Sequence, residues 1–350
     1  MKKKLRKNLL RILAVILILI VVAGGTIAFL FWRAVYKENV NLNGSETAYV
    51  YISTGSEYGD LLQSVKEAGV LKNANTFRWL AGRKNLPHHV YPGRYEFTAG
   101  MNNDEIVDML RSGAQKPLNV IFNNIRTSEQ LAGVISRQIE ADSAEIMRLL
   151  NDENILDELG LKPETVKTIF IPNTYEFFWN TSAEGFIERM YKEYRLFWNE
   201  NRLRQAEQQK LSPLQVSILA SIIDKETNRN DEKARIAGVY LNRLRNGWRL
   251  QADPTVVYAF YLENDSLLNR VYRRHTNMPS PYNTYLNIGL PPGPICIPSI
   301  SGLEAALRPE DHDYWFFVAK ADGSGYHHFS KTYNQHLRYA REHYDALNRK

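Results

Sequence analysis

The sequence from Ser212 to Gly247, SPLQVSILASIIDKETNRNDEKARIAGVYLNRLRNG, predicts two helices joined by a polar bend. Ser212 is a favourable N-cap residue, and Pro213 suits the first helical position. Apolar residues then recur at helical spacing, at Leu214, Ile218, Leu219, Ile222 and Ile223. The first helix is therefore expected to pack against the core of its domain.

The helical phase of this segment distinguishes two carboxylates. At about 100° per residue, Glu226 falls within the apolar arc, beside Leu219 and Ile222, and Asp224 points to the opposite, polar side. A carboxylate in apolar surroundings is costly to ionise, so its pKa is expected to rise, as a general acid requires. The competing interpretation pairs Glu226 with a buried Lys or Arg, the commoner situation for a single Glu.

The N-terminus predicts a membrane anchor. Residues 1–11, MKKKLRKNLLR, contain six cations and no acid, and predict a basic cytoplasmic tail. Residues 12–32 are uncharged and span about 31 Å as a helix, which matches the hydrocarbon core. A cleaved signal peptide is the alternative, but the run is too long and no small-x-small site closes it. We expect a single-pass protein of the plasma (inner) membrane whose remaining chain lies outside the cytoplasm.

Charge and cysteine content limit the other classes. The formal net charge is +6, and removal of the six cations of the tail leaves the rest of the chain neutral. Nucleic acid is therefore not an expected partner. The single Cys296 cannot form an internal disulfide. His327, His328 and His336 match no usual zinc spacing, so neither a metal nor another cofactor is expected.

The pattern of elements predicts an α+β protein with two regions beyond the anchor. A polar tether at 33–47 leads to a small α+β module at 48–115, and a mixed α+β domain occupies 116–350. The module offers no nucleophile or phosphate loop, so it is expected to be a spacer or a binding unit. The segment 249–252 reads as a short strand, which would direct Gln251 and Asp253 to one side.

Two loops rich in proline follow this segment, at 280–285 (SPYNTY) and 289–294 (GLPPGP). Such loops form rigid walls, and their amide and hydroxyl groups are suited to hydrogen-bonding sugars. Tyr282, Asn283 and Tyr285 are therefore candidates for contact with a substrate.

Four strings together resemble the YceG-like family of endolytic murein transglycosylases over most of the chain. They are ILASIIDKET (218–227), VYLNRLRNGWRLQADPTVVYA (239–259), SPYNTYLNIGLPPGPI (280–295) and DGSGYHHFSKTYNQH (322–336). The resemblance implies that 48–115 is a LysM-like module and that 116–350 is a catalytic domain with a lysozyme-like helical core. Two positions depart from the family pattern, Asn173 in place of Asp and Ile297 in place of Asn.

The resemblance also implies an activity and a site. Glu226 would be the catalytic acid, and Asp224 a variable position of the family's E-K-E-T pattern. The substrate-binding residues would be Gln251, Asp253, Tyr282, Asn283 and Tyr285. The implied reaction cleaves the β-1,4 bond between N-acetylmuramic acid and N-acetylglucosamine and forms 1,6-anhydro ends. The partners would be peptidoglycan glycan strands and the membrane, with cell-wall synthases as further candidates.

Two other classes remain open. One is a membrane-anchored muramidase that uses water and a second carboxylate, for which Asp253 is the candidate. The other is a non-catalytic glycan-binding protein in which the LysM-like module binds the glycan. The intact acid within an intact set of motifs favours the transglycosylase over this second alternative.

Overall fold

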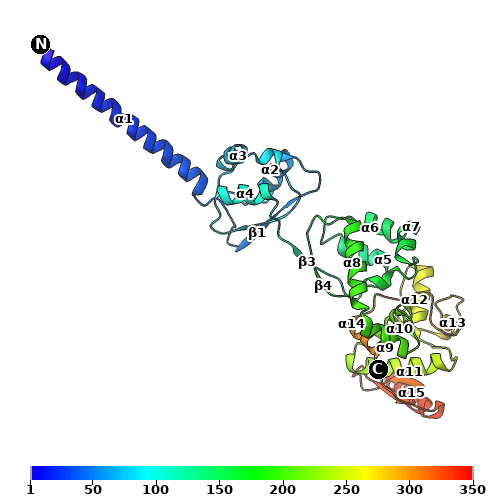
Figure 1. Ribbon diagram of the computed structural model, residues 1–350. Coiled ribbons are helices and arrows are strands. Elements are labelled where there is room, and N and C mark those ends of the chain that lie inside the picture. The colour runs from blue at the N-terminus through cyan, green and yellow to red at the C-terminus, as the bar shows by residue number, and fades with distance from the viewer. Residues whose placement is uncertain (1, 349–350) are drawn as a thin grey trace. The chain divides into compact units, whose positions relative to one another are not determined.

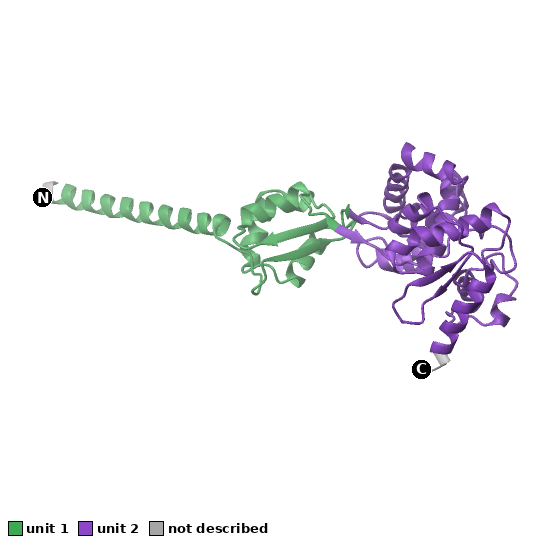
Figure 2. Ribbon diagram, turned by 90° about the horizontal axis from the view of Figure 1, so that it is seen from below, with its two compact units in different colours: residues 1–118, 176–180 green, residues 119–175, 181–350 purple. Residues whose placement is uncertain are grey.

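The computed structural model describes residues 2–348 of a mixed α+β chain (Figure 1). The chain divides into two compact units, one made of residues 1–118 and 176–180 and the other of residues 119–175 and 181–350 (Figure 2). Each unit has a hydrophobic core of its own.

The first element, α1 (Lys2–Tyr36), is one uninterrupted helix. It contains the predicted basic tail and the predicted membrane span, and it extends four residues past Trp32. By length and composition it can cross a membrane, and its apolar side chains between Leu5 and Trp32 are exposed. The helix is thus compatible with a single-pass membrane anchor.

The first unit is built on a two-stranded antiparallel sheet. β1 (Thr47–Ile52) pairs with β2 (Gly93–Thr98), and two helices, α2 (Tyr58–Glu67) and α3 (Ala74–Arg83), lie between them in the chain. Burial alternates along β2, where Tyr95 and Phe97 are fully buried, because successive side chains point to opposite faces. The short helix η1 (Leu86–His88) precedes β2, and α4 (Asn103–Ser112) follows it.

The predicted tether differs from the structure. Val35 and Val40 are almost fully buried in the core of the first unit. Between them, Asn39 Nδ2 donates to Asn103 Oδ1 at 2.7 Å, and the side-chain oxygen of Asn39, Oδ1, accepts from the Asn73 backbone N–H at 2.7 Å. Residues 35–40 are therefore part of this unit, because their polar groups are satisfied by its helices.

The second unit is mainly helical and has two short two-stranded sheets. Strand β3 pairs with β4, and β5 pairs antiparallel with β6. Its elements in chain order are β3 (Leu118–Ile121), α5 (Ser128–Ile135), α6 (Ser143–Leu150), α7 (Glu153–Leu159), η2 (Val166–Ile169), β4 (Thr174–Phe177), α8 (Ala183–Phe197), α9 (Glu200–Gln208), α10 (Pro213–Glu226), α11 (Asn230–Arg245), α12 (Asp253–Asn264), α13 (Arg273–Thr276), α14 (Ile300–Leu307), β5 (Phe316–Ala319), β6 (His327–Ser330) and α15 (Tyr333–Asn348).

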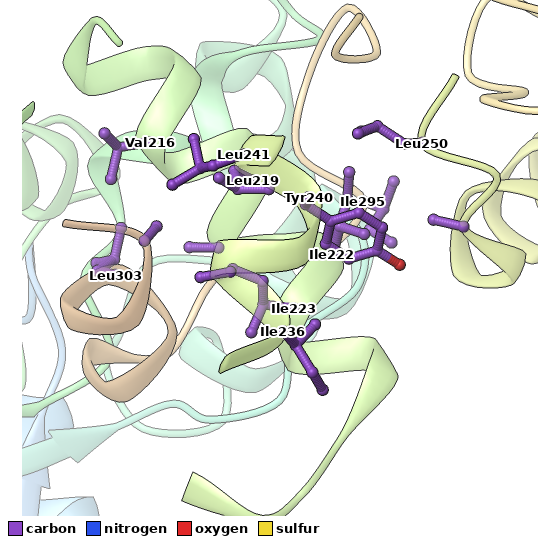
Figure 3. Close-up of a cluster of buried hydrophobic side chains, with 14 of the residues drawn as sticks. Val216, Leu219, Ile222, Ile223, Ile236, Tyr240, Leu241, Leu250, Ile295 and Leu303 are labelled. Carbon is purple, nitrogen blue, oxygen red and sulfur yellow. The ribbon is translucent and has the colours of Figure 1, made fainter. Parts of the chain in front are cut away.

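Helix α10 is the centre of the second core. Ser212 caps it in a reciprocal capping box with Gln215, as the sequence pattern predicts. All residues from Val216 to Ile223 are buried, so the helix is surrounded on every side. Figure 3 shows its side chains packed against Ile236, Tyr240 and Leu241 of α11, against Leu303 of α14 and against Ile295.

The predicted strand at 249–252 is absent from the structure. Gln251 adopts a left-handed backbone conformation with φ of 49°, and Asp253 is the first residue of α12. The Gln251 N–H donates to the Thr284 carbonyl, and the Ala252 N–H donates to Thr284 Oγ1. The segment is therefore a tight connection held by the loop around Thr284, and the expected strand alternation of Gln251 and Asp253 does not apply.

Candidate active site

A cavity of about 800 Å³ opens at the C-terminal end of α10. Glu226 contributes to its lining together with Tyr240 and Arg243 of α11 and Asp253 at the start of α12. The loop 268–273, the strand β5 and the helix α15 complete the walls. The cavity thus combines one end of the buried helix with elements that are distant from it in the sequence.

Glu226 is held by a hydrogen bond from the neighbouring helix. The Tyr240 hydroxyl donates to Glu226 Oε1, and Tyr240 itself is 1% exposed. Burial raises the pKa of Glu226 to about 7, with a further upward contribution from Asp253, against the opposing effects of Tyr240 and Arg243. Glu226 can therefore both hold and release a proton near neutral pH, while Oε2 is left for another partner.

Arg243 fixes the wall opposite the end of α10. It lies one helical turn after Tyr240, and its guanidinium donates to the Trp315 carbonyl at 2.9 Å and to the Leu250 carbonyl. Burial lowers its pKa from the usual value. These two bonds join α11 to the residues before Gln251 and to the approach to β5, so Arg243 connects three segments that contribute to the cavity lining.

Asp253 and Tyr285 form a second polar pair in the cavity. The Tyr285 hydroxyl donates to Asp253 Oδ1 at 2.6 Å. Burial, and then the Asp253 carboxylate, raise the pKa of Tyr285 well above its ordinary value. Gln251 also lines the cavity, from its left-handed backbone position. Four residues singled out in the sequence, Glu226, Gln251, Asp253 and Tyr285, are therefore brought together here.

The structure places Tyr282 and Asn283 behind the cavity wall. Tyr282 is 5% exposed and packs edge to face on Tyr258 in the hydrophobic core. Asn283 is fully buried, and its amide donates to the carbonyls of Thr276 and Met278 while its oxygen accepts from the Tyr285 N–H. Neither lines the cavity: the Tyr282 ring packs in the core, and the side-chain polar groups of Asn283 are bonded inside the loop that presents Tyr285. Contact of either residue with a substrate stays a prediction.

Asp224 also lies where the sequence does not predict it. Its carboxylate accepts from Lys233 Nζ at 2.7 Å, from the Ser299 N–H at 2.5 Å and from Ser299 Oγ at 2.8 Å. The side of α10 that was expected to be polar therefore packs against α11 and against the start of α14. A Cβ added at Gly302 would lie 2.6 Å from Asp224 Oδ1, so glycine is required for this close approach.

Several lining residues escaped the sequence analysis. His327 lines the cavity, and Glu232 of α11 accepts hydrogen bonds from the His327 backbone N–H at 3.0 Å and from His327 Nδ1 at 2.9 Å, so α11 holds the imidazole at the cavity wall. Tyr240 lies within the segment 212–247, three residues before Arg243. This spacing places both side chains on one face of α11, and it is the signal in the sequence that could have predicted that they line the same site. The loop and α15 residues carry no comparable signal; they are Leu268, Asn269, Arg270, Val271, Tyr272, Arg273, Tyr333, His336, His343 and Tyr344.

The two departures from the family pattern lie away from this cavity. Asn173 is exposed, and its side chain accepts from the Thr174 N–H. Ile297 is 3% exposed, and its N–H donates to the Ile125 carbonyl. Within residues 2–348, no cluster of three or more His, Cys, Asp or Glu side chains has the arrangement of a metal site.

Comparison with known proteins identifies the family. Residues 50–342 match the model of the YceG-like family. A Bacillus subtilis (strain 168) protein named endolytic murein transglycosylase is 30% identical over 345 residues, which are 94% of this chain and 93% of that protein. A protein of the same name from Streptococcus pneumoniae (strain ATCC BAA-255 / R6) is 24% identical over 340 residues, 88% of this chain and 60% of that protein.

A solved structure agrees with these matches. The crystal structure of a YceG-like protein from Listeria monocytogenes is 31% identical in sequence and superposes with a TM-score of 0.56 over 84% of this chain and 98% of that chain. The family match covers most of the chain, and the Bacillus relative is aligned over nearly its whole length. This chain therefore belongs to the YceG-like family.

Proposed function

We propose that the protein is an endolytic peptidoglycan lytic transglycosylase. It cleaves the β-1,4 bond between N-acetylmuramic acid and N-acetylglucosamine in nascent glycan strands and leaves 1,6-anhydro muramyl ends. The observation that carries this proposal is the buried Glu226 carboxyl, which accepts a hydrogen bond from Tyr240, has a pKa raised to about 7 and lines a cavity of about 800 Å³. The names of the Bacillus and Streptococcus relatives support the same activity.

The proposed reaction uses Glu226 twice. Protonated Glu226 gives its proton to the glycosidic oxygen as the bond from that oxygen to C1 of the muramyl residue breaks. The muramyl C6 hydroxyl then attacks C1, and its proton passes to the Glu226 carboxylate, which restores the acid. Water is not consumed. The Tyr240 hydroxyl holds Oε1 throughout, so the proton is exchanged at Oε2.

Hydrolysis is the second candidate, because a second carboxylate lines the same cavity. Asp253 raises the pKa of Glu226, which places its charge near the proposed acid. A muramidase would use this carboxylate to activate water or to bind C1. The hydrogen bond from Tyr285 holds Asp253 in place and stabilises its charge, and this arrangement equally suits substrate binding. The products decide between these two roles.

The test is the chemistry of the released ends. Purified glycan strands are digested with the detergent-solubilised full chain and, as a control, with a Glu226→Gln variant. A transglycosylase yields muramyl ends that resist borohydride reduction and are one water lighter than lysozyme products. Reducible ends that carry oxygen from labelled water would instead establish hydrolysis, and equal inactivity of both proteins would exclude an enzyme of either class.

The remaining architecture is proposed on the same basis. The strand-helix-helix-strand order of β1, α2, α3 and β2 supports a LysM-like module at 48–115 that binds glycan beside the membrane. The position of Glu226 at the end of the buried α10 supports a lysozyme-like helical core for the catalytic domain at 116–350. The charge of residues 1–11 supports a cytoplasmic N-terminus and an external catalytic domain in the plasma (inner) membrane. Cell-wall synthases are the proposed protein partners.

A further inference from the structure

Glu226 borders a second cavity in addition to the large one. This second cavity has a volume of about 260 Å³, and it shares Glu226, Asp253 and Val257 with the large cavity. A third cavity of about 390 Å³ shares Arg126 and Lys225 with the second. Because neighbouring cavities have lining residues in common, the three adjoin in series. The proposed acid therefore lies within a groove that continues beyond it, towards α5.

The third cavity has a marked charge imbalance. Its lining consists of Asn124, Arg126, Thr127, Gln130, Lys225, Tyr261 and Leu267, and it contains two cations and no acid. Glu129 lies between Thr127 and Gln130 in the chain, but it does not line the cavity. The large cavity, by contrast, mixes arginines with Glu226 and Asp253. The positive charge of the groove is therefore concentrated at the end near α5.

Neither cation is neutralised by the protein. Across the part of the chain that the structure describes, neither Arg126 nor Lys225 forms an ion pair, and the Arg126 guanidinium donates no hydrogen bond. Lys225 Nζ donates to the neutral Asn124 amide oxygen at 2.6 Å. Gln130 Oε1 accepts from the Arg126 backbone N–H, which leaves the Gln130 Nε2 group as an additional donor. Donors thus dominate the polar groups of this cavity.

We propose that this third cavity is a subsite for a carboxylate carried by the muramyl residues of the glycan strand. The proposal rests on the proposed function and adds a substrate requirement to it. The sugar rings of the strand are uncharged, so a pair of cations can select only among their substituents. The muramyl residue carries a lactyl group that is amide-linked to a peptide stem with free carboxylates. A guanidinium fork with a neighbouring ammonium group binds a carboxylate through charge-assisted hydrogen bonds.

The location of the two cations determines what the subsite would do. Lys225 immediately precedes Glu226, so a carboxylate bound by Lys225 fixes the strand relative to the acid. Arg126 lies before α5, on a separate element, and therefore provides a second, independent anchor point. Arg126 and Lys225 are thus specificity-determining residues, which select strands that still carry anionic substituents.

The experiment varies the charge of the enzyme and of the substrate separately. The full chain in detergent is assayed with three uncross-linked substrates: strands with intact stems, the same strands with all carboxyl groups coupled to methylamine, and strands stripped of stems by an amidase. The enzyme variants are Arg126→Gln, Lys225→Gln and the double variant. Lys162→Gln is the control, since Lys162 is exposed and lines none of the three cavities.

The expected result is a ratio. For the wild type and Lys162→Gln, kcat/KM on intact strands should exceed that on neutralised strands by at least about tenfold, the magnitude of one charge-assisted hydrogen bond. Each single variant should lower this ratio, and the double variant should bring it close to one. In intact strands the free carboxylates are those of the peptide stem, whereas the amidase leaves a new carboxylate on the lactyl group. Cleavage of stripped strands at the intact-strand rate would show that a lactyl carboxylate also fits the subsite, and a rate as low as that of neutralised strands would show that only the stem carboxylates reach it.

Two outcomes would overturn the proposal, and they differ from a failure of the proposed function. A wild-type ratio near one, or a double variant that keeps the wild-type ratio, would exclude the carboxylate subsite while cleavage itself continued. Absence of Glu226-dependent cleavage on all three substrates would instead contradict the proposed function. Thermal unfolding of each variant verifies that the ratios are measured on folded protein.

Discussion

The ammonium group of Lys233 lies 2.7 Å from Asp224 Oδ1, and the two side chains are only 7% and 9% exposed. This buried ion pair joins the last turn of α10 to α11, two residues before Glu226. Ser299, the N-cap of α14, donates to the same carboxylate, so three helices meet at Asp224. The two acids of this helix end therefore have different tasks: Asp224 holds the helices together, and Glu226 faces the cavity.

Substitution should separate these two tasks. Asp224→Asn leaves Lys233 buried without a counter-charge, and we expect it to lower the free energy of unfolding by about 3 kcal/mol. Glu226→Gln should leave the fold intact and reduce kcat at least about 100-fold, the usual contribution of a general acid. Chemical unfolding and strand cleavage, measured on both variants, check this prediction. A stable Asp224→Asn protein without activity would show that Asp224 takes part in the chemistry.

The raised pKa of Glu226 makes stability depend on pH. The folded-state pKa of Glu226 is about 7, above the ordinary value of 4.5, so between these two pH values the folded protein binds more protons than the unfolded chain. The stabilisation from this group is complete below pH 4.5 and decreases as pH rises through 7, by about 3 kcal/mol in all. Glu226→Gln lacks this titration. The free energy of unfolding of Glu226→Gln, relative to that of the wild type, should therefore increase with pH in unfolding experiments between pH 4.5 and 8. A difference that stays constant over this range would contradict the raised pKa of Glu226.

The hydrogen bond from Tyr240 should set the alkaline limb of the activity profile. Protonated Glu226 is the active form, so kcat/KM should fall above about pH 7. Tyr240→Phe removes a donor to the carboxylate, which raises the pKa of Glu226, and the limb should move up by about one pH unit. Tyr326→Phe is the control, because the Tyr326 hydroxyl bonds to Asp231 and does not line the cavity. A limb that stays in place in Tyr240→Phe would assign it to another group.

Asn283 and Gln251 should respond differently to truncation. Asn283→Ala removes a fully buried amide and leaves the carbonyls of the half-buried Thr276 and Met278 without their donor, and we expect it to lower the free energy of unfolding by about 2 kcal/mol. Gln251→Ala removes an exposed side chain of the cavity and should raise KM with little loss of stability. Thermal unfolding and steady-state kinetics of the pair test this division. An Asn283→Ala protein of unchanged stability and raised KM would restore Asn283 as a substrate-binding residue.

The orientation of the anchor follows from the charge of residues 1–11. A reporter fused after Lys350 should be active only outside the cytoplasm, because positive flanks remain on the cytoplasmic side. Replacement of the six cations of this tail by Asn should produce a mixed orientation, and cytoplasmic activity of the fusion should then appear. Cytoplasmic activity of the unmodified fusion would remove access to peptidoglycan and contradict the proposed function.

Local signals in the sequence determined the anchor helix and the two helices around Glu226. Caps and periodicity act over a few residues, so the capping box at Ser212 and the apolar spacing of α10 suffice to predict them. The resemblance to the YceG-like family is likewise present in the strings themselves, and the comparisons confirm it.

Only the tertiary structure decided which polar groups face the cavity. Helical phase gives the direction in which a side chain points, but it does not say which other residues lie in that direction. Because α10 is buried on all sides, the carboxylate of Asp224, on the side predicted to be polar, contacts Lys233 and Ser299. The bond from Tyr240 to Glu226 joins residues of two helices whose relative placement no spacing rule supplies. Asn283 lies behind Tyr285 because it can be buried at low cost there, since its amide is hydrogen-bonded within the loop, and Tyr282 lies there because its ring packs on Tyr258 in the core.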